Sequence, residues 1–171
     1  LPGGRLQALS IAWDTRPKER GGQRWFHLYP GQAIKAGDRL HWTGIDQNWN
    51  YQCADCHSTH LQKRFDSKTN VFSTTWSEIN VACEACHGPG SRHAGWARQQ
   101  GDWRHITDKG LELLLDERRG ASWTRAPGAA TATRSTPRTS SREIESCARC
   151  HARRGQLTDD IGFGRPLADS Y

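Results

Sequence analysis

The chain has 171 residues, a formal net charge of +6 and 35% hydrophobic residues, which is low for a soluble domain. Side chains alone therefore predict a thin core that something else must fill. No run of about 18 apolar residues occurs, which excludes a transmembrane helix. The scattered Lys and Arg residues predict a solvated surface and no nucleic-acid partner. The chain opens on LPGG without a basic, apolar leader, so we interpret it as a mature chain or a segment of a longer one.

Residues 6–29 predict a β-hairpin. Apolar and aromatic residues alternate on both sides of the turn-forming stretch TRPKERGGQ, as they do in paired strands. The alternating residues are Leu9, Ile11 and Trp13 before the turn and Trp25, His27 and Tyr29 after it. Residues 30–50 are rich in Gly and aromatic residues and predict a loop.

Two helices are predicted on either side of a GPG turn at residues 88–90. Thr75 and Glu78 form a capping box that opens the first helix, which the turn ends. Ser91 opens the second helix, which closes at Gly101.

Residues 108–119 predict a further helix, with basic residues in its last turn. Its inward face holds three leucines, Leu111, Leu114 and Leu115. Residues 121–141 are rich in Ser, Thr, Ala and Pro and predict a flexible loop. Ser140 and Glu143 form another capping box, which opens a last helix that ends near Gly155, before a loop-like tail.

All the cysteines lie in three copies of the pattern Cys-x-x-Cys-His. The copies are Cys53, Cys56 and His57; Cys83, Cys86 and His87; and Cys147, Cys150 and His151. This pattern is the attachment signature of c-type haem. Two cysteines one helical turn apart form thioethers with the two vinyl groups of the porphyrin, and the next histidine ligates the iron. The sequence therefore predicts three haem c groups.

A zinc site and a redox dithiol are the two other interpretations of the cysteines, and neither explains the complete pattern. A zinc site takes four ligands, so three pairs leave one pair over, and zinc gives no reason for a histidine after each pair. A redox dithiol of the thioredoxin type needs one motif in a βαβ setting, which the sequence lacks. Haem also supplies the missing apolar core, and its propionates offset the positive charge of the chain.

The second axial ligand of each iron is predicted to be a histidine, because the chain contains no Met. Bis-histidine ligation implies low reduction potentials. His93 follows the GPG turn and can reach a neighbouring haem, His41 lies shortly upstream of the first motif, and His27 lies on a predicted strand. His60 and His105 are expected to be hydrogen-bonding or surface residues. Trp42, Trp49 and Trp76 are expected to pack against haem.

Three segments resemble a known family: NWNYQCADCHST, TTWSEINVACEACHGPGSRH and ESCARCHARRGQL. They are similar to multihaem c-type cytochromes related to the tetrahaem electron carrier of ammonia oxidisers, some relatives of which carry tetratricopeptide repeats. The resemblance covers about residues 24–160 and implies a periplasmic or extracellular electron carrier with haems in close pairs. It also implies that His93 ligates another haem. Family members have a further upstream motif that this chain lacks, so a preceding segment or another chain is a possible source of a fourth haem or a ligand.

The expected fold class is mainly α with extensive loops, a multihaem cytochrome c organised by haem, with one small N-terminal β-hairpin. We expect a single domain over residues 1–171. Its segments are 1–50 (hairpin and loop), 51–120 (two motifs and helices), 121–141 (flexible loop) and 142–171 (third motif and tail).

The predicted function is electron transfer, with no catalytic residue assigned. The expected partners are redox protein donors and acceptors, and another cytochrome chain or copies of this chain remain open. The alternative is a multihaem reductase or oxidase in which one open iron acts on a small nitrogen or sulfur species. Arg92, Arg149 and Arg153 lie near the motifs and suit that chemistry, but pairing with haem propionates is the preferred interpretation of them.

Overall fold

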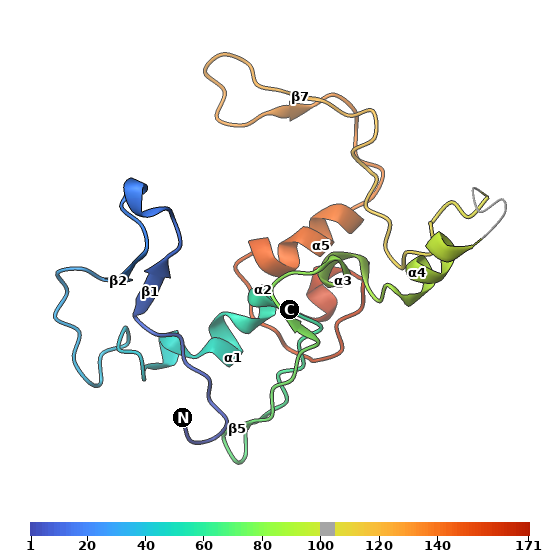
Figure 1. Ribbon diagram of the computed structural model, residues 1–171. Helices are drawn as coiled ribbons and strands as arrows, with labels where there is room; N and C mark the ends of the chain where they lie inside the picture. Colours follow the sequence, from blue (N-terminus) through green and yellow to red (C-terminus); the bar gives the residue numbers. More distant parts are fainter. Residues whose placement is uncertain (100–104) are drawn as a thin grey trace. The chain divides into compact units, whose positions relative to one another are not determined.

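The computed structural model describes residues 1–99 and 105–171, which form two compact units (Figure 1). Unit 1 holds Leu1–His57 and Leu61–Trp76, and unit 2 holds Ser58–His60 and Ser77–Tyr171. Helices make up 24% and strands 14%, so the prediction of a mainly α chain is wrong. The physical reason is that two of the predicted helices do not form, whereas the predicted loops are indeed extensive.

Unit 1 begins with the predicted hairpin, which is confirmed. Strand β1 (Ile11–Asp14) pairs antiparallel with β2 (Arg24–His27), and the connection holds a short 3-10 helix, η1 (Lys18–Arg20). Trp13 lies opposite Trp25, and their ring centroids are 5.4 Å apart in an edge-to-face contact. The alternation of large side chains therefore predicted the hairpin correctly.

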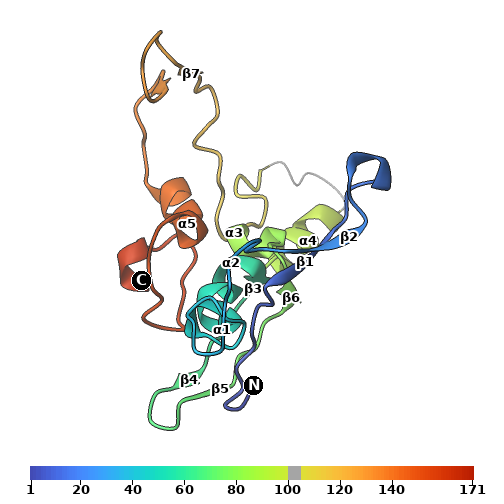
Figure 2. The ribbon, with the colours of Figure 1, turned by 90° about the vertical axis from the view of Figure 1, so that its left-hand side faces the viewer.

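The rest of unit 1 leads to the first motif. Four elements follow the loop: η2 (Ile45–Gln47), α1 (Trp49–Gln52), α2 (Ala54–His57) and the hairpin of β4 (Phe65–Asp66) with β5 (Val71–Phe72), which Figure 2 shows near the N-terminus. The Asn48 side chain accepts a hydrogen bond from the backbone N–H of Tyr51 and caps α1.

Asn50 is the polar centre of unit 1. Its side chain is fully buried; Oδ1 accepts a hydrogen bond from the Leu6 N–H (2.7 Å) and Nδ2 donates to Thr74 Oγ1 (2.8 Å). Asn50→Ala leaves the Leu6 donor unsatisfied and is expected to lower the free energy of unfolding of the haem-loaded protein by about 1–3 kcal/mol. Denaturant titration measures this loss, with the exposed Gln52→Ala on the same helix as control. Equal stability of the two variants would contradict it.

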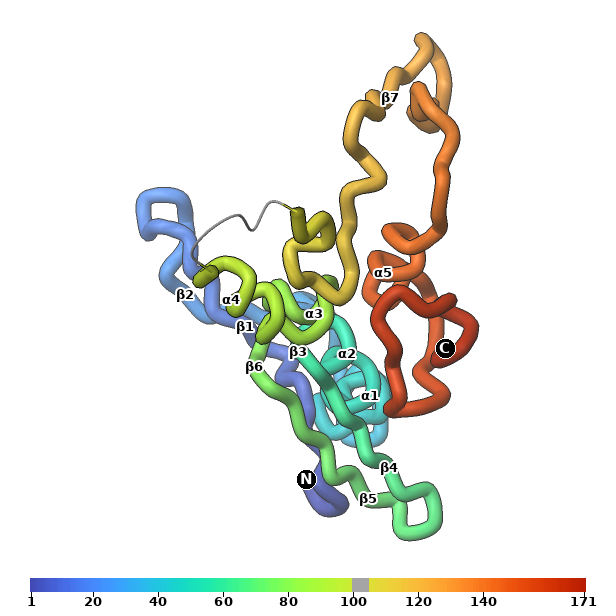
Figure 3. Tube along the Cα trace, turned by 90° about the vertical axis from the view of Figure 1, so that its right-hand side faces the viewer, coloured from blue at the N-terminus to red at the C-terminus, as the bar shows by residue number. Residues whose placement is uncertain are grey.

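Unit 2 holds the second and third motifs. Its elements are β3 (Ser58–Thr59) paired with β6 (Glu78–Ile79), α3 (Cys83–His87), α4 (Ser91–Arg98), β7 (Trp123–Thr124) paired with β8 (Thr133–Arg134), α5 (Arg142–His151) and η3 (Leu167–Asp169). The C-terminal segment returns alongside α5 (Figure 3), where the Leu167 N–H donates to Glu145 Oε2 at 2.7 Å.

The helix predicted from the capping box at Thr75 is wrong. Thr75 pairs with Gln62 through backbone hydrogen bonds, and Glu78 lies in β6. Asn80 has a φ of 72°, a left-handed conformation that a helix cannot continue through. Helix α3 therefore begins only at Cys83, where the motif starts.

The helix predicted over residues 108–119 is also wrong, since turns occupy this segment. Lys109 (φ 54°) and Gly110 (φ 70°) are left-handed, and the Leu113 N–H donates to the carbonyl of His87 instead of to a helical partner. Leu113, which was not among the inward leucines, is the buried one. Contacts with α3 and α4 override the local helix signal here.

The other two helices of unit 2 are confirmed with shifted ends. Helix α4 begins at Ser91 but ends at Arg98, and the predicted stop at Gly101 lies outside the described residues. Helix α5 begins after Ser141 instead of Ser140, without a side-chain cap, and ends at His151. The predicted loop over 121–141 contains the short β7–β8 ladder (Figure 2).

The hydrophobic core is thin, as the composition predicts. Among the described residues, the buried hydrophobic ones are Ala54, Leu61 and Leu113. Large apolar side chains stay exposed, with Trp25 at 65% and Leu157 at 80%. In the part of the chain that the structure describes, no helix has the length and apolar character needed to span a membrane.

Candidate functional site

Each Cys-x-x-Cys-His motif lies at the end of a helix. Helices α2, α3 and α5 end at His57, His87 and His151, respectively. None of the cysteines forms a disulfide, and all are exposed or half-buried: Cys53, Cys56, Cys83, Cys86, Cys147 and Cys150. Residues three apart lie on the same side of a helix. The helical stretches at the second and third motifs therefore present both thiols to one side, as attachment of one planar group requires.

The second and third thiol pairs, which both lie in unit 2, form no metal-binding cluster with each other. Within residues 1–99 and 105–171, no three His, Cys, Asp or Glu side chains are placed to hold a metal ion together. A zinc site built from several cysteine pairs would need such convergence. The separate pairs fit one covalent attachment per motif.

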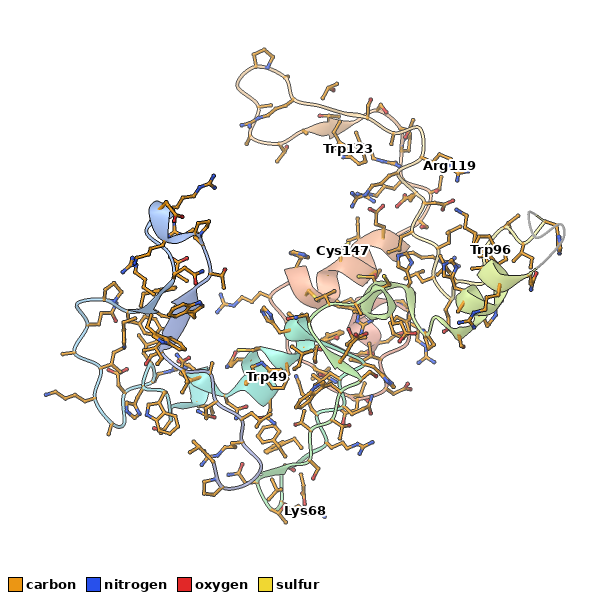
Figure 4. The ribbon with its side chains drawn as sticks, in the orientation of Figure 1. Trp49, Lys68, Trp96, Arg119, Trp123 and Cys147 are labelled. Carbon is orange, nitrogen blue, oxygen red and sulfur yellow. The ribbon has the colours of Figure 1, made fainter. Side chains whose placement is uncertain are left out.

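The first motif begins at Cys53, directly after α1, and its remaining residues form α2 in unit 1. Partial burial raises the pKa of the Cys53 thiol, and the neighbouring Cys56 raises it further. Trp49, which begins α1, lies 5.1 Å from Trp76 between ring centroids (Figure 4). The structure thus brings together two of the three tryptophans expected at haem, whereas Trp42 is 40% exposed.

In the second motif, a backbone carbonyl fixes the ring of the histidine. His87 Nδ1 lies 2.8 Å from the carbonyl oxygen of Leu113. Because a carbonyl only accepts hydrogen bonds, Nδ1 carries the proton, and in the neutral ring Nε2 keeps its lone pair. This is the tautomer that a metal-ligating histidine needs.

The second and third motifs lie against each other. Ser146 Oγ donates to the carbonyl of Cys86 (3.4 Å), and an Arg149 guanidinium N–H donates to the carbonyl of Ala85 (3.4 Å). Both donors come from α5 and both acceptors from α3, which lie next to each other in Figure 1. The guanidinium of Arg149 also lies 5.0 Å from the ring of Phe163.

The third motif borders a cavity of about 330 Å³, within the size range of ligand pockets. Its lining combines the motif residues Cys147 and His151, three apolar side chains and two arginines: Ile144, Ala148, Ala152, Arg118 and Arg138. Figure 4 labels Cys147 on α5. Each arginine already pairs with a carboxylate, Arg118 with Glu143 and Arg138 with Glu117. The thiol, the imidazole and the apolar wall fit a haem. Glu143 also lines the cavity, so the arginines would have to exchange their carboxylate partners to pair with haem propionates.

His93 has the same ring arrangement as His87. Its Nδ1 lies 2.8 Å from the carbonyl oxygen of Lys109, so Nδ1 is the donor and Nε2 is left with its lone pair. The ring stacks on Trp96, with centroids 5.2 Å apart and planes at 21°. Of the predicted distal ligands, His93 is thus held in the tautomer that is protonated on Nδ1 and can ligate a metal through Nε2.

The other predicted distal histidines differ. His27 Nδ1 accepts a hydrogen bond from the Tyr29 N–H (3.0 Å), which places the proton of the neutral ring on Nε2. His41 Nδ1 lies 2.7 Å from Thr43 Oγ1, a hydroxyl that can donate or accept. Neither arrangement tests ligation directly, so both residues stay predictions.

Sequence reasoning missed the carbonyls of Lys109 and Leu113 and the hydroxyl of Ser146. Every residue carries a carbonyl, so no side-chain pattern marks the two that orient histidines. A helix over residues 108–119 would have bonded these carbonyls internally, which concealed their role. Ser146 carries no sequence signal of its own; it lies three residues before Arg149, on the side of α5 that contacts α3.

Residues 23–88 match the family described as cytochrome c554 and c-prime. The matched segment contains the first two motifs together with His27 and His41. No curated protein and no solved structure matches the chain. The family match supports a c-type cytochrome, with haem c as cofactor and electron transfer as activity.

Proposed function

We propose that the protein transfers electrons through three covalently bound haem c groups, one at each motif. The observation that carries the proposal is that each of the three helices α2, α3 and α5 ends at the histidine of a Cys-x-x-Cys-His motif whose cysteines form no disulfide. His57, His87 and His151 are the proposed proximal ligands. Haem, once attached, supplies reversible one-electron chemistry at iron, and the residues of the chain bind and orient it.

The contacts between α3 and α5 support direct exchange between the second and third sites. Ser146 and Arg149 hold the two attachment helices against each other. Electron transfer needs such proximity and no side-chain chemistry. We propose this pair of sites as the conducting part of unit 2.

Histidine is the proposed distal ligand throughout, because the chain contains no Met. His93 is supported by its bond to Lys109, which leaves Nε2 available. His41 and His27 are proposed with the support of their place inside the matched segment. Two imidazoles at an iron imply a low reduction potential.

The proposed partners are redox proteins that donate and accept electrons, and another cytochrome chain or copies of this chain remain open. Their access is supported by exposed attachment points, since Cys83, Cys147 and Cys150 all lie at the surface. We propose that the protein acts in the periplasm or outside the cell, because thioether attachment of haem takes place after export.

Visible spectra in the presence of carbon monoxide test the ligation. If every iron has two histidines, the ferric and dithionite-reduced protein is expected to be entirely low-spin and its spectrum unchanged by the gas. A high-spin haem that binds carbon monoxide in the wild-type protein would contradict complete ligation and favour the reductase or oxidase alternative. His93→Ala is the positive control, since it is expected to open one haem of the three.

A further inference from the structure

One turn, Asp108–Gly110, is fastened to helix α4. Asp108 pairs with Arg92 at 3.5 Å, and its Oδ1 also accepts the Gly110 N–H at 2.8 Å. Between them, the carbonyl of Lys109 accepts the hydrogen bond from His93 Nδ1. The turn is therefore closed by a hydrogen bond within itself and bound to two consecutive residues of α4, Arg92 and His93.

The turn lies so close to α4 that residue 110 must be glycine. Gly110 is buried and left-handed, with φ +70°. A Cβ at this position would lie 2.7 Å from the carbonyl oxygen of Arg92 and 3.0 Å from the Cα of His93. Both are backbone atoms of α4, so a larger residue must push the turn away from the helix.

The chain that continues from this turn reaches the second motif. The Leu113 carbonyl accepts the hydrogen bond from His87 Nδ1, and the Leu113 N–H donates to the His87 carbonyl at 3.3 Å. The Leu113 side chain is 3% exposed, which anchors this end of the segment. Two imidazoles from two different helices are thus oriented by one stretch of six residues.

We propose that residues 108–113 are a positioning segment, which sets the tautomer and ring direction of both His87 and His93. The inference rests on the proposed function, in which these histidines ligate iron. Both carbonyls force the proton onto Nδ1 and restrict rotation of the ring, so that Nε2 is presented in a fixed direction. Loss of such an outer partner typically weakens metal ligation about 10–100-fold. Gly110 is the residue on which the arrangement depends.

The test compares Gly110→Ala with Gly120→Ala in the haem-loaded protein. Gly120 is a matched control, because its φ is +74° and a Cβ there would meet nothing within 4 Å. Both variants carry the same backbone strain, but only Gly110→Ala displaces the turn. We expect Gly110→Ala to keep three thioether-bound haems by mass, to make one haem high-spin and open to carbon monoxide, and to regain the low-spin spectrum when imidazole is added. Gly120→Ala is expected to behave as wild type.

A second readout follows the histidine itself. In the ferrous protein, the Nδ1–H of His93 is expected to exchange with solvent faster in Gly110→Ala than in Gly120→Ala, because the acceptor carbonyl of Lys109 has moved. Should Gly110→Ala fail to fold, Asp108→Ala loosens the same turn without backbone strain, and the same two changes are expected in smaller measure.

The outcomes separate the positioning role from the ligation. If Gly110→Ala and Asp108→Ala match Gly120→Ala in spectrum and exchange while His93→Ala opens a haem, the positioning segment is refuted and the ligation stands. If His93→Ala leaves all haems low-spin, His93 is not a ligand, and the proposed ligation fails together with the inference.

Discussion

Without haem, the chain is expected to show no cooperative thermal unfolding transition. Burying one large apolar side chain contributes about 1.5–3 kcal/mol, whereas ordering the backbone of one residue costs about 1–2 kcal/mol. With buried hydrophobic residues limited to Ala54, Leu61 and Leu113 in the described part of the chain, the polypeptide alone cannot offset that cost. Near-ultraviolet circular dichroism and calorimetry of protein produced without haem attachment measure the transition, with the haem-loaded protein as reference.

Free thiols could themselves prevent folding of the haem-free protein by forming wrong disulfides. A haem-free variant with all the cysteines replaced by serine controls for this effect. We expect it to lack a transition as well. A cooperative transition in either haem-free protein, within a few degrees of the haem-loaded one, would show that haem is not the missing core.

Replacing Cys147 and Cys150 with serine is expected to remove one covalent haem of the three. The pyridine haemochrome absorbance per chain should fall by one third, and the mass by one haem, because serine forms no thioether. Removal of this haem is also expected to change the environment of the second haem site, because Ser146 and Arg149 of α5 hydrogen-bond to the backbone of α3. We therefore expect the reduction potential of the haem at Cys83 and Cys86 to shift as well.

Ala148→Ser is the control for this variant. It places a serine inside the same motif, at a half-buried position of α5, while both thiols remain. Although Ala148 lines the cavity at this motif, both thioethers can still form, so the variant is expected to keep three covalently attached haems. An unchanged haem content in the double cysteine variant would disprove attachment at this motif, and an unchanged potential at the second site would disprove coupling through the contact between α3 and α5.

The sequence predicted the parts of the molecule that local chemistry determines. The alternation around Trp13 and Trp25 predicted the hairpin, and the signal at Ser140 and Glu143 predicted a helix where α5 lies. The motif residues follow from covalent chemistry that needs a fixed spacing, so the candidate attachment residues were identified without coordinates. Their occupation by haem stays a prediction.

The failures have a common cause, which is competition between local helix signals and contacts from distant residues. Thr75 has the sequence of a helix cap, but Gln62 takes its backbone hydrogen bonds. The segment after Asp108 has helical periodicity, but close approach to α4 and the bond from Leu113 to His87 bend it into turns. Such contacts join residues that no short window of sequence contains.

The segment 121–141, here called the arm, contains the β7–β8 hairpin and is a place where the chain can be cut. Along the backbone, this exposed hairpin is the route from the second motif to the third, but the hydrogen bonds from α5 to α3 connect the two motifs directly. Cleavage in the arm after the exposed Arg125 would leave those contacts intact. A trypsin-nicked protein is therefore expected to keep both fragments together, and a gene split at this point could encode two polypeptides that assemble into the same unit.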